Sequence, residues 1–291
     1  MKIALSADTS CTISKECAKK LGIKVFSLNV FINGEEFLDG VSITLDELAK
    51  SMRSGCNIKT STPPPQDVID YFTKIFDEGY DRIIHFTISS KLSSMYQLFS
   101  MISRDEFDNK VIVIDSYSVC SLMLSHVMYA YDEIKKDTEI EKIVEGIEKR
   151  KEKNSVIFVP ENLTALKNGG RISPAVAALG NMIGLKPVIQ LKEGALEKDS
   201  MTRNTKKAFQ EHINKLADSY PINEFDYCIV SFDGNESLVS YIIKVLSEKF
   251  DNYDPIVTPF AINVGAHTGP GSIGLLVTPK INGKSLSEFI K

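Results

Sequence analysis

Strand-like and helix-like segments alternate along the first half of the chain, and this alternation restricts the fold more than any other feature. Apolar, strand-like runs cover residues 2–8, 82–88 and 111–115, and helical patterns at 66–78 and 93–103 precede the last two. Parallel strands need long crossover connections, which are most often helices. The order therefore predicts an α/β fold whose first sheet is mainly parallel and covered by helices.

Three local signals define shorter elements in this half. Residues 25–32 alternate in polarity and end at Asn33-Gly34, a pair typical of a tight hairpin turn. Thr44 and Glu47 have the spacing of a capping box, which predicts the start of a helix. Residues 60–65 end in three consecutive prolines and predict an extended segment ahead of the helix at 66–78.

The charged stretch at 135–154 closes the regular alternation, and we place a domain boundary there. We therefore expect two α/β domains, residues 1–153 and 154–291. Before the boundary, helices are expected at 117–135 and 139–153. Beyond it, strands are expected at 156–159, 187–191, 196–202 and 227–232, and helices at 161–167, 174–183, 204–220 and 237–250.

Composition excludes several classes of function. The chain has 291 residues and a formal net charge of −4, which argues against a nucleic-acid-binding surface as its main role. No apolar stretch approaches the roughly 18 residues of a membrane span, and the N-terminal apolar run is too short for a signal peptide. Five scattered cysteines without a C-x-x-C pair fit reduced thiols. We expect a soluble cytoplasmic protein without membrane insertion, and transient membrane contact stays open.

The segment 265–274, Gly-Ala-His-Thr-Gly-Pro-Gly-Ser-Ile-Gly, is the strongest candidate for ligand binding. Apolar, strand-like runs at 256–264 and 273–277 flank it, so we expect a glycine-rich turn that displays His267. Residues 269–274 match G-x-G-x-x-G, but a dinucleotide site needs a following helix and an acidic residue about 20 positions on. A strand-like run follows instead, and seventeen residues remain after Gly274. A dinucleotide is therefore excluded.

Other motifs for catalysis or metal binding do not occur in the sequence. The chain contains no Walker-type phosphate loop, no H-E-x-x-H and no G-x-S-x-G. The histidines at positions 85, 126, 212 and 267 lack metal-ligand spacing. We therefore expect no metal, no cofactor and no catalytic residue.

Hydroxyl-rich turns follow three of the expected strands, at residues 8–10, 89–94 and 115–116. Ligands of open parallel sheets bind at the carboxyl ends of strands. Ser93 also stands at the start of an expected helix, where its hydroxyl and the first amides can hold an anion. Taken one at a time, most of these serines are explained as helix caps.

Four segments together resemble one family. Thr60-Ser61-Thr62-Pro63 is similar to its Thr-Ser-x-Pro signature, and residues 89–97 are similar to its Ser-x-x-Leu-Ser-Gly-Thr-Tyr-Gln segment. Residues 166–173 and 267–271 match two further blocks, in the same order. On these segments the chain is identified as a member of the DegV family of bacterial fatty-acid-binding proteins. It departs from the family pattern at Ser94-Met95, where Gly-Thr is usual, and at Thr62, where Gln is usual.

The resemblance implies two α/β domains with a long-chain fatty acid held between them. Its carboxylate would be bound by Thr60, Ser61, Ser93 and His267, because hydroxyls and an imidazole donate hydrogen bonds without burying a second full charge. Four further residues could either bind the ligand or be structural; they are Thr62, Ser94, Arg171 and Thr268. For Arg171 the favoured interpretation is structural, with its side chain bracing the turn against a neighbouring carboxylate.

The resemblance also implies a partner. The chain would present its fatty acid to a separate fatty-acid kinase, related to dihydroxyacetone kinases, which forms the acyl phosphate for phospholipid synthesis. Arg203, in a basic cluster at a strand-to-helix junction, matches the position implicated in docking that kinase; an ordinary exposed charge is the alternative.

Two rival functions stay open on the sequence alone. The chain could be a substrate subunit like that of dihydroxyacetone kinases, whose histidine engages a small ketone covalently, or a lipid-responsive regulatory protein. The apolar residues at 175–179 and 182–183 favour a lipid slot over a small polar pocket, but they fit an ordinary core as well.

Overall fold

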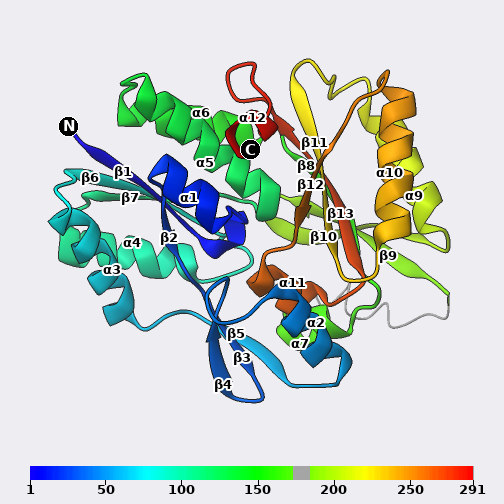
Figure 1. Ribbon diagram of the computed structural model, residues 1–291, viewed down its shortest axis with the longest axis horizontal. Helices are drawn as coiled ribbons and strands as arrows, with labels where there is room; N and C mark the ends of the chain where they lie inside the picture. Colours follow the sequence, from blue (N-terminus) through cyan, green and yellow to red (C-terminus); the bar gives the residue numbers. More distant parts are fainter. Residues whose placement is uncertain (173–183, 291) are drawn as a thin grey trace.

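A four-stranded sheet in the order β2-β1-β6-β7 occupies the first half of the computed structural model, which describes residues 1–172 and 184–290 (Figure 1). All three strand pairs are parallel, which confirms the predicted sheet. Helix α4 packs against α3 and β7, whereas α5 packs against α6 and β1. The strands are β1 (Ile3–Asp8), β2 (Lys24–Phe26), β6 (Arg82–Thr87) and β7 (Val111–Asp115); the helices are α1 (Lys15–Leu21), α3 (Pro65–Asp77), α4 (Met95–Phe107), α5 (Cys120–Lys135) and α6 (Ile140–Lys151).

A six-stranded mixed sheet follows, in the order β10-β9-β8-β13-β11-β12. Its pairs are antiparallel except β11 with β12. Apolar side chains of α9 and α10 pack on one face of this sheet. The elements are β8 (Ser155–Val159), α7 (Thr164–Gly169), β9 (Lys186–Lys192), β10 (Ala195–Thr202), α9 (Thr205–Leu216), β11 (Phe225–Phe232), α10 (Glu236–Lys249), β12 (Ile256–Pro259), α11 (Ile262–Thr268), β13 (Ser272–Pro279) and α12 (Ser287–Ile290).

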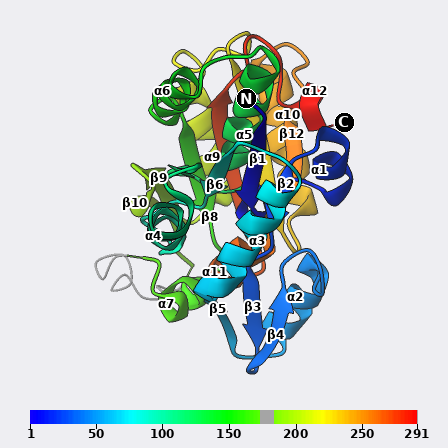
Figure 2. The same ribbon diagram turned by 90° about the vertical axis from the view of Figure 1, so that its left-hand side faces the viewer.

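A small antiparallel sheet, β4-β3-β5, lies with α2 at one end of the molecule (Figure 2). Its strands are β3 (Asn29–Ile32), β4 (Glu35–Leu38) and β5 (Ile58–Ser61), and α2 is Leu45–Arg53. The predicted hairpin is confirmed, because Asn33 and Gly34 both adopt positive φ angles between β3 and β4. The predicted capping box is also confirmed, with reciprocal hydrogen bonds between Thr44 and Glu47. This sheet brings β5 next to α11.

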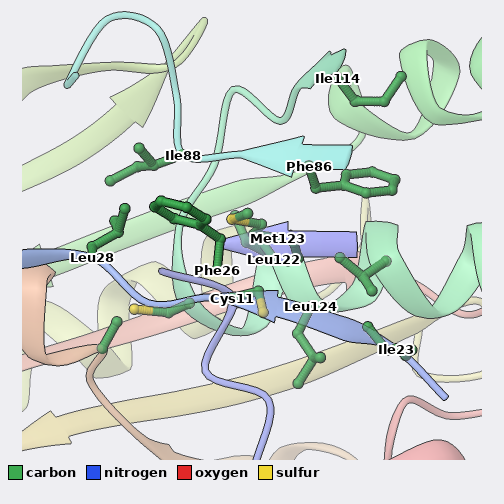
Figure 3. Close-up of a cluster of buried hydrophobic side chains, with 14 of the residues drawn as sticks. Cys11, Ile23, Phe26, Leu28, Phe86, Ile88, Ile114, Leu122, Met123 and Leu124 are labelled. Carbon is green, nitrogen blue, oxygen red and sulfur yellow. The ribbon is translucent and has the colours of Figure 1, made fainter. Parts of the chain in front are cut away.

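One apolar core joins the two large sheets. It contains side chains of the parallel sheet, such as Phe86 and Ile114, and of α5, such as Leu122 and Met123 (Figure 3). It continues to Leu276 on the face of the six-stranded sheet that lies opposite α9 and α10. Helix α5 contacts β1 on one side and β11 and β13 on the other. The space beside α5, between the two sheets, is therefore where a buried ligand would lie.

The prediction of a single strand at 256–264 was wrong beyond its first residues. Strand β12 ends at Pro259, and the following residues form α11 instead. The first turn of this helix is held by Asp39, whose Oδ2 accepts a hydrogen bond from the Asn263 backbone amide at 3.1 Å. Nearly all of α11 is buried, so its sequence lacks the exposed polar face of a surface helix. Periodicity cannot distinguish such a helix from a strand.

The remaining differences are smaller. The run expected as one strand at 25–32 is divided between β2 and β3, because the chain leaves the parallel sheet and enters the small one. Helix α4 begins at Met95, two residues later than expected, so Ser93 lies ahead of the helix. The helix expected at 174–183, with its apolar residues, lies outside the described residues. The boundary between residues 153 and 154 stays a prediction.

Candidate functional site

His267 is the residue around which the candidate site is built. It lies in the last turn of α11, so the expectation of a turn between two strands was wrong; the turn begins at Gly269. Its Nε2 atom is 2.7 Å from the Thr60 hydroxyl of β5. On the other side of the ring, a side-chain carbon on Gly169 would overlap the Nδ1 atom. The glycine at the end of α7 is therefore needed for the imidazole to occupy this position.

A polar pocket lies beside His267 and brings together most of the predicted site residues. They come from segments that are far apart in the sequence: β5 with the following residue, the loop before α4, the turn after α7, and α11. The pocket is also lined by Asn29 and Asn263, which sequence reasoning missed. The predicted residues that line it are Thr60, Ser61, Thr62, Ser93, Ser94, Arg171 and His267.

The hydroxyls of this pocket are available to a ligand. Within the described ranges, the side chains of Ser61 and Ser93 form no hydrogen bond, whereas Thr60 bonds His267. The neighbouring Ser89 is used structurally, since its hydroxyl donates to the Gly194 carbonyl at 2.7 Å. The other two hydroxyl-rich turns are likewise braced within the fold. Asp8, for example, accepts hydrogen bonds from the amides of Ser10 and Ile88, each at 2.8 Å.

Arg171 supplies the positive charge of the polar pocket. Its guanidinium is partly buried and donates to the carbonyl oxygens of Gly169 and Leu92. The prediction that a carboxylate pairs with Arg171 was wrong. In the part of the chain that the structure describes, no Asp or Glu forms an ion pair with Arg171. Carbonyl oxygens hold the turn without neutralising the charge, so the guanidinium can still bind an anion.

Burial, with a smaller contribution from the Arg171 charge, lowers the pKa of His267 to about 4. The imidazole is therefore neutral at physiological pH, with one nitrogen as a donor and the other as an acceptor. When Nε2 carries the proton, it donates to Thr60 Oγ1, and the Thr60 hydroxyl is free to donate into the pocket. This arrangement offers donors to an anion, and the cationic charge comes from Arg171.

An apolar slot adjoins the polar pocket. It shares Arg171, Asn263 and His267 with the polar pocket, together with Ile88 and Leu92, so the two form a continuous site. The slot is narrow, with a cavity volume of about 70 Å³, so its walls must move apart to admit an acyl chain. Its remaining walls come mainly from the six-stranded sheet and α5, and include Val119, Cys120, Val156, Phe158, Leu166, Leu191, Leu196, Val230, Phe260, Val264, Thr268 and Leu276.

Two of the predicted residues lie outside the polar pocket. Thr268 borders the apolar slot, and its hydroxyl is buried without a hydrogen-bond partner among the described residues. Arg203 is exposed between β10 and α9, where it lines neither the pocket nor the slot.

Asn263 is a residue that the sequence could have indicated. It is a polar residue in a mostly apolar run and is only 6% exposed. Its side-chain amide donates to the Ser10 hydroxyl at 2.6 Å, which ties α11 to the first turn after β1. A polar amide within such a run indicates a side chain that must be hydrogen-bonded when buried. Asn263 therefore has a structural role and also forms part of the pocket wall.

Comparison with known proteins places this geometry in a family. A family model described as "uncharacterised protein, DegV family" matches residues 2–280. The chain belongs to the DegV family. A DegV domain-containing protein of Clostridium perfringens is 31% identical over 287 residues, which cover 94% of this chain and 98% of the relative.

Solved structures of fatty-acid-binding proteins are similar over almost the whole chain. One is a fatty-acid-binding DegV family protein of Thermus thermophilus, with 26% identity and a TM-score of 0.86 over 96% of this chain and 100% of the other. Another is a stearic acid-binding protein of Eubacterium ventriosum, with 26% identity and a TM-score of 0.84 over 96% of this chain and 99% of the other. The two-domain α/β fold expected from the resemblance is therefore confirmed.

Within residues 1–172 and 184–290, no three or more His, Cys, Asp or Glu side chains are grouped as ligands for a metal ion. None of the helices in these ranges is both long enough and apolar enough to cross a membrane.

Proposed function

We propose that this DegV protein binds a long-chain fatty acid, with the carboxylate in the polar pocket and the acyl tail in the apolar slot. The observation that carries the proposal is the shared wall of the two cavities at Arg171 and His267. A ligand that fills both must have a compact polar head joined to an apolar chain. The fatty-acid binding of the DegV family protein from Thermus thermophilus and of the stearic acid-binding protein from Eubacterium ventriosum supports the same class of ligand.

The head group of this ligand is a carboxylate. Thr60, Ser61 and Ser93 supply hydroxyl donors, and Arg171 supplies the compensating charge. His267 orders Thr60 through their 2.7 Å hydrogen bond. In this scheme the carboxylate keeps its charge on binding, because charged and neutral donors replace the water that solvated it.

The tail provides most of the binding free energy. Each buried methylene contributes about 0.8 kcal/mol, so a tail of roughly fifteen methylenes contributes on the order of 10 kcal/mol before the costs of association. A small ketone has no acyl tail and would not gain this contribution to the binding free energy. The slot therefore favours a fatty acid over the small substrate of a dihydroxyacetone-kinase-like subunit.

We further propose that the bound acid is presented to a separate fatty-acid kinase, related to dihydroxyacetone kinases, for acyl-phosphate formation in phospholipid synthesis. In this role the chain is a carrier and the kinase supplies the catalytic groups and the nucleotide. Arg203 is the proposed docking residue. Its exposed position between β10 and α9, away from the pocket, supports a role in contact with a partner.

The proposed ligand can be tested directly by native mass spectrometry of the purified protein. We expect a bound species of fatty-acid mass that is released by organic extraction, and reconstitution with stearic acid after delipidation. A protein that carries no lipid and binds no stearic acid would contradict the proposal. Covalent capture of dihydroxyacetone by His267 would favour the small-ketone alternative.

A further inference from the structure

Phe260 separates the apolar slot from a second cavity. It lies between β12 and α11, is only 6% exposed, and lines both spaces. The second cavity is a groove on the other side of Phe260, with a volume of about 410 Å³. One aromatic side chain therefore forms a common wall of the slot and the groove.

The groove beyond Phe260 is suited to hydrocarbon. Its walls contain Ile13, Val25, Leu45 and Ile262, and its rim includes Val41, which is 57% exposed. Asp39 and Lys15 are the charged residues among those that line it. An acyl chain that passed Phe260 would therefore enter apolar surroundings.

Phe260 is also placed away from the head group. It precedes α11, whereas His267 lies in the last turn of the same helix. Seven residues of helix correspond to about 10 Å along the axis. Between the two positions the helix presents Asn263 and Val264 to the slot. A chain anchored by its carboxylate beside His267 meets Phe260 in a bent conformation, because the extended length of a tail of roughly fifteen methylenes exceeds this distance.

We propose that Phe260 sets the upper limit of acyl-chain length by closing the slot where it meets the groove. This inference rests on the proposed binding of a fatty acid and adds a determinant of specificity to it. The Phe232 ring helps to hold the wall, since its centroid lies 6.5 Å from that of Phe260. An acid longer than the slot must displace the Phe260 ring or leave part of its tail unburied.

Competition between stearic acid and the longer docosanoic acid on delipidated protein tests the wall. We expect the wild type to prefer stearic acid, and Phe260→Ala to shift the preference toward docosanoic acid by about tenfold or more, since two further buried methylenes account for a change of that size. Phe260→Trp should shift the preference in the opposite direction. Phe209→Ala, which removes a buried ring on α9 far from the slot, is the matched control and should leave the ratio unchanged.

The outcomes separate this inference from the proposed function. If the wild type binds neither acid, the proposed function is wrong. If stearic acid binds but the ratio is the same in wild type, Phe260→Ala and Phe260→Trp, the wall is elsewhere and the inference is overturned. Phe260→Leu gives a smaller shift in the same direction as Phe260→Ala and replaces it if the alanine variant does not fold.

Discussion

His267 and Ser93 line the polar pocket from two different elements, and their side chains can be removed separately. We predict that Ser93→Ala weakens stearic acid binding by about ten- to a hundredfold, because a hydrogen bond to a charged group contributes about 1.5–3 kcal/mol. His267→Ala should cause a loss of similar size, because the Thr60 hydroxyl is then no longer oriented toward the carboxylate. Isothermal titration of delipidated protein measures the loss. Thermal unfolding should change little, since neither side chain belongs to the apolar core.

A second histidine provides the control for this prediction. His212 is partly buried between α9 and β10 and lies outside both cavities of the site. His212→Ala should bind stearic acid as the wild type does. Unchanged affinity in both His267→Ala and Ser93→Ala would remove the proposed head-group site.

Gly169 supports His267 without facing the ligand itself. A methyl group at this position overlaps the imidazole Nδ1 atom, so Gly169→Ala must displace the ring from Thr60. The backbone itself accepts alanine, because Gly169 is helical and lacks a positive φ. We predict that Gly169→Ala binds stearic acid as weakly as His267→Ala, with a melting temperature close to that of wild type.

The double variant distinguishes this mechanism from a general disturbance. If Gly169 acts through the ring, Gly169→Ala has little further effect in the His267→Ala background. Additive losses would show that Gly169 contributes in another way. Asn168→Ala, at the adjacent position, is the control for a change in α7 alone.

At the scale of elements, α11 depends on a buried carboxylate at its first turn. Burial raises the pKa of Asp39 to about 7, although hydrogen bonds from the Asn263 amide and the Thr9 side chain act in the opposite direction. The folded protein therefore holds the Asp39 proton more tightly than the unfolded chain, whose pKa is 3.8. The stability from this proton is complete below pH of about 4 and is lost as the pH rises to about 7.

Asp39→Asn removes this titration and keeps an oxygen acceptor for the Asn263 amide. We predict that the variant gains stability relative to wild type as the pH rises from about 4 to about 7, by at most about 1.36 kcal/mol per pH unit. Urea unfolding at a series of pH values measures the difference. Asp218→Asn, at an exposed position in the turn after α9, should follow the wild-type curve. A difference that does not vary with pH would show that Asp39 is not the titrating group.

Local sequence signals correctly predicted those elements whose conformation is determined by their own residues. Asn33-Gly34 specifies a turn with two positive φ angles, and Thr44 with Glu47 specifies a helix start, so both could be assigned without tertiary information. Helix α11 could not, because its conformation depends on a cap from Asp39, a residue more than 200 positions away. Its near-complete burial also erased the polar face that identifies a helix.

At the scale of the whole molecule, the site is an assembly of distant segments. The Thr60 to His267 hydrogen bond spans 207 positions in the sequence. Each partner was assigned from a resemblance in its own motif, but no residue pattern predicted the bond or the shared wall of pocket and slot. The role of Gly169 could not be predicted from the sequence either, because it depends on packing against the His267 ring, which belongs to another element.

The proposed kinase contact involves the whole molecule, because the docking residue and the pocket lie on different parts of the fold. Arg203 is exposed after β10, and the described part of the chain offers it no ion-pair partner. We predict that Arg203→Glu abolishes most kinase-dependent phosphorylation of bound fatty acid and leaves stearic acid affinity within about twofold of wild type, because reversing an exposed interface charge acts on the encounter with the partner. Phosphate transfer from labelled ATP in the presence of the kinase measures the first effect, and titration calorimetry the second.

Arg104→Glu makes the same charge change on α4, at another exposed arginine. It should leave both measurements unaltered, which separates a specific contact from a general response to net charge. Raising the salt concentration should weaken phosphorylation by the wild type more than by Arg203→Glu, because an exposed charge contact is screened by ions. If Arg203→Glu loses fatty-acid binding, Arg203 instead contributes to the stability of the carrier. If the bound acid of this variant is phosphorylated normally, Arg203 is not part of the interface.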